Sequence, residues 1–143
     1  MRAPTPDNPF PTVVLRHEQG GGEAHFDWFL AEDPHGAQPL ASFRCDQRPD
    51  GPFGPAGMPL SRQEPHRGRY LDYEGPIGED RGHVRCVARG WIEGWNRLEG
   101  QWTLAVRWPE GSMRQIRITF ADDGKARLAM DVGILHNDGV KKR

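Results

Sequence analysis

Two histidines and an aspartate lie on either side of three consecutive glycines near the start of the chain. The segment reads RHEQGGGEAHFD, with His17 before the glycines and His25 and Asp27 after them. Imidazole nitrogens and carboxylate oxygens are ligands for several first-row metal ions. If one strand ends at His17 and a second returns through His25 and Asp27, which share one face of that strand, the three side chains converge.

Three ligands from neighbouring strands leave coordination positions open, which is typical of a catalytic metal site rather than a closed structural one. We therefore predict that His17, His25 and Asp27 bind a divalent metal ion. The alternative is a solvated hairpin that carries histidines by chance, because the chain has 6 histidines.

The elements that would position these residues have the period of two that is typical of strands. In the segment 100–108, for example, Trp102, Leu104 and Val106 face one way. Short strands separated by turn residues predict an all-β fold, an antiparallel barrel or sandwich of about eight strands. The expected strands are 12–15, 25–30, 40–45, 69–73, 82–88, 90–93, 100–108, 113–120 and 126–132. Prolines and glycines predict a long loop over 46–59.

The chain of 143 residues fits a single domain. We expect an irregular proline-rich arm over 1–11, one domain over 12–136 and a basic tail over 137–143. The formal net charge of −1 supplies no overall field that would attract nucleic acid, so polyanion binding would depend on local arginine clusters.

The remaining bulk features concern redox state and location. Cys45 and Cys86 have no CxxC spacing and are expected to be reduced, partly buried thiols. No apolar run approaches the roughly 20 residues that cross a bilayer, and the first residues lack the apolar segment of a signal peptide. We therefore expect a cytoplasmic protein with no membrane partner.

Beyond the glycine segment, several motifs resemble those of one known family, in the same order along the chain. RHEQGGGEAHFD is similar to the His…His-Tyr-Asp segment of the 3′-phosphoesterase module of bacterial DNA ligase D, also named the DNA polymerase ligase N-terminal domain. The segment 64–75, EPHRGRYLDYEG, keeps the family's spacing of His66, Tyr70, Glu74 and Gly75. GHVRCVARGW at 82–91 and LEGQWTLA at 98–105 resemble its later strands. The resemblance covers roughly residues 12 to 108.

This resemblance implies a small, closed or partly closed antiparallel β-barrel that binds manganese or zinc and trims 3′ ends of nucleic acid during DNA repair. It implies that His17, His25 and Asp27 are the metal ligands and that His66 and Tyr70 contact the scissile phosphate. A chain without ligase or polymerase domains would act alone or recruit such a partner in trans. Without the resemblance, His66 would be read as a polar loop histidine and Tyr70 as a core or rim residue of a strand.

The sequence departs from the family where the family binds phosphate. Phe29 stands where the family has an arginine, two residues after the aspartate, and Gln47 stands in place of its lysine, with Arg48 adjacent. Upstream of His66, Arg62 is the nearest basic residue and is the candidate for substrate binding. A phenyl ring cannot replace the bidentate fork of a guanidinium group.

These departures leave two alternatives to a nucleic-acid 3′-phosphoesterase. One is a catalytically weak or inactive metal-binding barrel that binds nucleic-acid ends or a repair protein. The other is a hydrolase for a smaller, less charged substrate. Arginines near the second motif could replace the lost phosphate contacts, although a solvated outer face of the barrel is the simpler interpretation of them; they are Arg62, Arg67, Arg69, Arg85 and Arg89.

Overall fold

The computed structural model describes residues 2–78, 81–110 and 112–131. The described chain is all-β apart from the short 3₁₀ helix η1 (Gly68–Leu71). Its strands are β1 (Phe10–Glu18), β2 (Ala24–Leu30), β3 (Leu40–Cys45), β4 (Met58–His66), β5 (Gly75–Pro76), β6 (His83–Leu98), β7 (Gln101–Arg107), β8 (Met113–Phe120) and β9 (Lys125–Met130). The expected tail over 137–143 and the last residues of the expected domain lie outside the described residues. In the part described, no helix is long and apolar enough to span a membrane.

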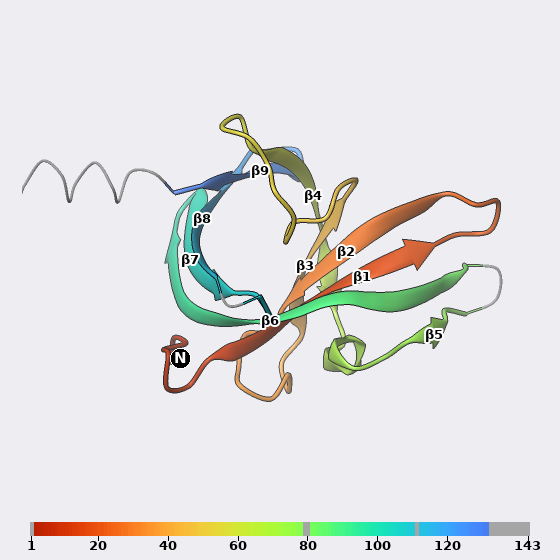
Figure 1. Ribbon diagram of the computed structural model, residues 1–143, viewed down its shortest axis with the longest axis horizontal. Coiled ribbons are helices and arrows are strands. Elements are labelled where there is room, and N and C mark those ends of the chain that lie inside the picture. The colour runs from red at the N-terminus through yellow and green to blue at the C-terminus, as the bar shows by residue number, and fades with distance from the viewer. Residues whose placement is uncertain (1, 79–80, 111, 132–143) are drawn as a thin grey trace, which may run out of the picture.

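The strands form one antiparallel sheet that closes on itself. The order is β1-β2-β3-β4-β9-β8-β7-β6-β5, and a further pairing between β1 and β6 closes eight of these strands into a barrel. β5 is attached outside the closed barrel, on the edge of β6. Figure 1 shows β7, β8 and β9 curving around one half of the molecule, while β1, β2 and the first part of β6 extend away from it. The prediction of a small antiparallel barrel is confirmed, and the barrel is closed.

Aromatic side chains fill the interior of the barrel. Trp28 of β2 lies 5.8 Å from Phe43 of β3, between ring centroids, and Phe43 lies 6.0 Å from Trp102 of β7. Phe120 of β8 lies 4.8 Å from Trp102. Because β3 and β7 are not neighbours in the sheet, these contacts cross the lumen. The lumen is therefore a packed core, and a ligand has to bind elsewhere.

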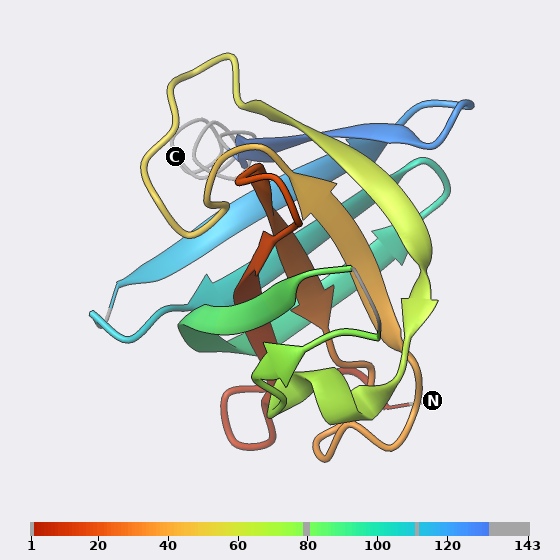
Figure 2. The same cartoon turned by 90° about the vertical axis from the view of Figure 1, so that its right-hand side faces the viewer.

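The opposite face of β1 and β2 carries the predicted metal ligands, because side chains alternate along a strand. The segment that follows β4 packs against this face. Tyr70 of η1 lies 5.9 Å from the ring of Phe29, the neighbour of Trp28 in sequence, and η1 contacts β1. Figure 2 shows η1 and β5 at the front of the molecule, in the view toward the extended ends of β1 and β6. The site thus lies between the outer surface of the barrel wall and a short covering segment.

Four expectations about individual elements require correction. The expected strand 69–73 is wrong, since its first residues form η1. The expected strands 82–88 and 90–93 are one strand, β6, which shifts register against β1 between Val14 and Leu15 and against β7 between Ile92 and Gly94. The arm expected over 1–11 ends earlier, because β1 begins at Phe10.

The fourth correction is β4, where the sequence predicted the end of a long loop and no strand beyond it. β4 pairs with β9 over Met58–Ser61 and with β3 mainly over Ser61–His66. Pro59 and Pro65 therefore lie where β4 has a hydrogen-bonded neighbour on one side, and a proline without an N–H group is tolerated at such positions.

A buried hydrogen-bond chain links the two faces of β2 and yields a stability prediction. The Trp28 indole N–H donates to the Thr12 hydroxyl at 2.9 Å, and that hydroxyl donates to the Phe29 carbonyl at 2.7 Å. Thr12→Val leaves a buried donor and a buried acceptor without partners, so the free energy of unfolding should fall by about 1–3 kcal/mol in urea denaturation. Thr119→Val on the exposed side of β8 is the control and should change it by less than about 0.5 kcal/mol. Equal effects of the two substitutions would contradict this account.

Candidate metal centre

The register of the β1–β2 hairpin brings the three predicted ligands together. His17 pairs directly with His25, and Leu15 pairs with Asp27, so the three polar side chains occupy adjacent positions on one face. The connection is tight: the Gln19 amide donates to the Glu23 carbonyl at 2.8 Å.

Glycine is required within this connection. Gly21 and Gly22 have φ angles of +99° and +91°, a region that other L-residues rarely adopt. The consecutive glycines are thus explained by the turn that sets the register of the two histidines.

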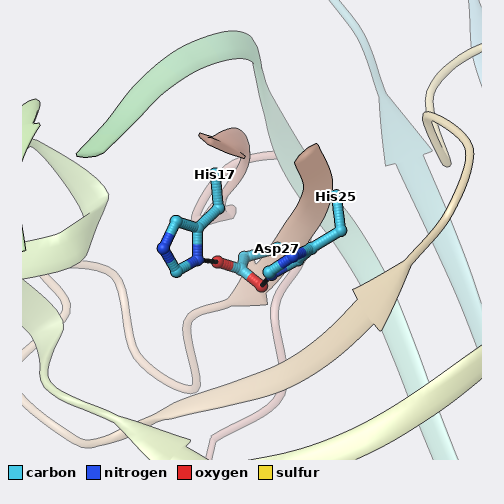
Figure 3. A group of neighbouring side chains, drawn as sticks. All are labelled: His17, His25 and Asp27. Carbon is cyan, nitrogen blue, oxygen red and sulfur yellow. Dashed lines mark hydrogen bonds and ion pairs between the residues drawn. The ribbon is translucent and has the colours of Figure 1, made fainter. Parts of the chain in front are cut away.

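The carboxylate of Asp27 lies between the two imidazoles. Its Oδ2 is 3.3 Å from His17 Nδ1 and its Oδ1 is 3.0 Å from His25 Nε2, as Figure 3 shows. The three potential ligand atoms lie within 4.8 Å of one another. A shared ion about 2.1 Å from each ligand atom requires separations below about 4.2 Å, so small rotations of the side chains complete the geometry. The three residues can hold a metal ion.

A neighbouring carbonyl group fixes the orientation of His17. The Nε2 of His17 lies 2.8 Å from the backbone oxygen of Arg81. A carbonyl oxygen only accepts, so Nε2 carries a proton and donates it, which leaves Nδ1 as the ring nitrogen that faces Asp27. A hydrogen bond of this kind commonly orients metal-bound histidines and increases their basicity.

The surroundings of His25 favour its neutral imidazole form. Its side chain is buried, and burial is the main cause that lowers its pKa, against the opposing effect of the Asp27 carboxylate. Electrostatic interactions with Arg44 and His17 lower the pKa of His25 further. Its Nδ1 is buried without a hydrogen-bond partner among the described residues. Because metal ions bind the neutral form of histidine, this environment favours a metal ion over a proton.

An open cavity of about 600 Å³ surrounds this triad. Its described walls come from β1, β2, β3, the end of β4, η1 and the segment before β6. The polar residues that line it are His17, Gln19, His25, Asp27, Arg44, Gln63, His66, Arg67, Tyr70 and Arg81. The structure thus brings the three predicted ligands and the two predicted phosphate-contacting residues into one cavity.

His66 is anchored through one ring nitrogen. Its Nδ1 lies 2.9 Å from the Glu64 carbonyl and 3.0 Å from the Ser42 hydroxyl, which itself donates to the Leu40 carbonyl. Because Glu64 offers only an acceptor here, Nδ1 carries the proton and donates. Nε2 is therefore the ring nitrogen left for a ligand.

Tyr70 reaches the same cavity from η1 rather than from the strand expected over 69–73. Its ring lies 5.9 Å from that of His66 and stands nearly perpendicular to it, at 77°. Phe29 packs against both, 4.9 Å from the His66 ring. Phe29 is almost fully buried, so it forms an apolar support beneath His66 and Tyr70.

Arg62 is not placed with these residues. It belongs to the face of β4 that carries Leu60, and its guanidinium group lies 4.9 Å from the centre of the Trp102 ring and 4.7 Å from that of Phe120. Arg48 is bound to Asp50 at 2.7 Å and to the Val87 carbonyl. Neither arginine lines the cavity described above.

Arg44 and Arg81 line the cavity but were not among the sequence candidates. Arg44 pairs with Asp27 across β2 and β3. Both residues lie in strands that the sequence predicted, so only the register between the two strands was needed to place Arg44 beside the triad. Arg81 had no signal, because it lies in a loop. A scan against models of protein families and a search of curated proteins both find no match for this chain, so what the site can do has to follow from its own residues.

The metal centre yields a direct prediction. Asp27→Asn keeps the size of the side chain but removes its charge, so the affinity for Mn²⁺ or Zn²⁺ in isothermal titration should fall by at least about tenfold. Asp122→Asn, in the exposed turn between β8 and β9, is the matched control. If the two variants bound metal equally well, the triad would not be the metal site.

A second prediction concerns the loop that holds His17. Gly82 has a φ of +81°, and a Cβ atom there would collide with the backbone oxygen of Glu18. Gly82→Ala should therefore displace the neighbouring Arg81 carbonyl from His17 and weaken metal affinity about 10- to 100-fold, as loss of such supporting contacts does. Gly100→Ala also changes a glycine with a positive φ, but at an open position, so metal affinity should stay constant. Unchanged affinity in Gly82→Ala would show that the Arg81 carbonyl does not support the site.

Proposed function

We propose that this protein is a metal-dependent phosphoesterase that acts on nucleic-acid 3′ ends, removing a 3′-phosphate or a 3′-ribonucleotide in DNA repair. The observation that carries the proposal is the convergence of the His17–His25–Asp27 triad with His66 and Tyr70 in one open cavity. The motifs that resemble the ligase D phosphoesterase module support the same assignment, in which a ligase or polymerase acts as a separate partner.

The residues match the needs of phosphate-ester hydrolysis. A bound divalent metal ion polarises a phosphoryl oxygen and lowers the pKa of bound water. In the reaction the oxygen of water bonds to phosphorus, the bond from phosphorus to the leaving oxygen breaks, and the leaving oxygen takes a proton. His17, His25 and Asp27 hold the ion, with manganese and zinc both suited to this set of ligands.

His66 and Tyr70 serve the leaving group and the phosphate. With Nδ1 fixed on the Glu64 carbonyl, a proton on Nε2 of His66 can be transferred to the leaving oxygen. The Tyr70 hydroxyl donates a hydrogen bond to a phosphate oxygen, where negative charge grows in the transition state. Phe29 holds both rings in place and limits the access of water beneath them.

The test uses purified protein, Mn²⁺ and a DNA primer that ends in a 3′-phosphate or in a single ribonucleotide. We expect release of phosphate or nucleoside, a loss of about 10²- to 10⁴-fold in kcat for His66→Ala, and no detectable turnover for His25→Ala. His35→Ala, in the exposed loop between β2 and β3, should keep the wild-type rate. Turnover that persists in His25→Ala would exclude this site as its source.

Phe29 favours one other function, that of a catalytically weak barrel that binds nucleic-acid ends or a repair protein. A buried phenyl ring supplies no charge to the transition state, and loss of one such contact costs about 2.7–4 kcal/mol in comparable sites. Tight Mn²⁺ binding and end binding without turnover on either primer would support this second function.

A further inference from the structure

Three arginines around the cavity have no partner within the described chain. Arg44, Arg67 and Arg81 are exposed, and none of their guanidinium groups makes a hydrogen bond, an ion pair or a ring contact to a described residue. Most other described arginines are engaged. Those bound to carboxylates are Arg16, Arg48, Arg89, Arg97, Arg107 and Arg117; those bound to carbonyls or packed on rings are Arg62, Arg69, Arg114 and Arg127.

The three arginines reach the cavity from separate segments. Arg44 comes from β3, Arg67 follows the end of β4, and Arg81 precedes β6. Asp27 is the one acidic residue among the described residues that line the cavity. Three guanidinium groups thus face a single carboxylate, in a chain whose formal net charge is −1. A metal ion on the triad would add positive charge, so the described lining of the cavity favours an anionic ligand.

Arg44 is the best placed of the three for a group bound at the metal. It lies opposite Asp27 in the β2–β3 pairing, on the same face, and no ion pair joins its guanidinium group to the Asp27 carboxylate. In the β3–β4 pairing Arg44 lies opposite Ser61 and His66 lies opposite Leu40, and both Arg44 and His66 line the cavity that holds the triad. An anion bound at the triad would therefore lie beside Arg44.

We propose that Arg44 binds the terminal phosphate of the substrate, and that Arg67 and Arg81 bind phosphates further along the same strand. Phe29 on β2 offers no positive charge to the substrate phosphate, and in this proposal Arg44 on β3 supplies that charge instead. This inference rests on the proposed function for the identity of the ligand, and its substrate is a nucleic-acid strand with an end phosphate rather than a free mononucleotide.

The test measures binding rather than turnover. A fluorescein-labelled single-stranded DNA that ends in a 3′-phosphate, and the same strand with a 3′-hydroxyl, are titrated with protein and Mn²⁺ by fluorescence anisotropy at several salt concentrations. To prevent hydrolysis, each measurement uses the His66→Asn background. Arg44→Gln should weaken binding of the phosphate-ended strand about tenfold and leave the hydroxyl-ended strand nearly unchanged.

Arg67→Gln and Arg85→Gln complete the comparison. Arg67→Gln should weaken both strands alike and reduce the slope of log affinity against log salt by about 0.7, as loss of one single-strand phosphate contact does. Arg85 is exposed on β6 and does not line the cavity, so Arg85→Gln should change neither strand by more than about twofold. Arg44→Lys keeps the charge without the fork and should recover part of the preference for the phosphate end.

Each outcome distinguishes phosphate binding by Arg44, Arg67 and Arg81, which we call the arginine clamp, from the proposed activity. The clamp is wrong if Arg44→Gln binds both strands as the His66→Asn parent does, or if this parent shows no preference for the phosphate end. Either result would count against the clamp even if the wild-type chain hydrolysed the primers. If the preference depends on Arg44 while the wild-type chain hydrolyses nothing, the clamp stands and the proposed catalytic activity fails. If Arg44→Lys recovers no preference, the loss in Arg44→Gln reflects packing and the clamp is again wrong.

Discussion

The pairing of β1 with β2 is the constraint on which the site depends. Its register places His17 opposite His25 and leaves Asp27 two positions along, so one hairpin supplies all three candidate metal ligands. A slip of one residue would turn His25 and Asp27 to the other face of β2, toward the lumen. The register is secured on both sides of β1, by the glycine turn toward β2 and by the closing ladder with β6. The geometry of the metal centre is therefore a consequence of barrel closure.

Two adjacent residues of β2 serve different parts of the molecule, one the core of the barrel and the other the cavity outside it. Trp28 joins the aromatic packing that fills the lumen, whereas Phe29 packs beneath His66 and Tyr70 on the outside. Thr12 ties these two positions together through its hydrogen bonds. Different side chains thus build the core and the cavity, and the backbone of one strand links the two. This arrangement explains how a small chain can keep an exposed cluster of charges on a stable scaffold.

The sequence predicted the elements in which large apolar residues alternate without interruption. β3 and β8 have the expected bounds, and Trp102, Leu104 and Val106 are buried on one face of β7 as expected. β4 could not be predicted in the same way, because its two prolines are tolerated only through the staggered pairing with β3 and β9. η1 was mistaken for a strand since Tyr70 and Leu71 resemble strand residues, and their burial depends on packing against β1 that no local pattern records.

The site was predicted where it is local and missed where it is not. The three candidate metal ligands lie in a single hairpin, so spacing was enough to place them together. Arg62 was chosen by its distance in sequence from His66, yet it faces Trp102 on the other side of β4. Arg44 required the register of β2 against β3, which depends on barrel closure and not on either strand alone.

Because the candidate site lies outside a lumen already filled by aromatic rings, the residues that line its cavity can be exchanged without repacking the core. An arginine lost from one strand and another gained on its neighbour would leave the interior undisturbed. Such an architecture allows the binding surface to diverge quickly in evolution while the barrel stays the same, and it would make sequence resemblance fade at the ligand-binding positions sooner than in the scaffold.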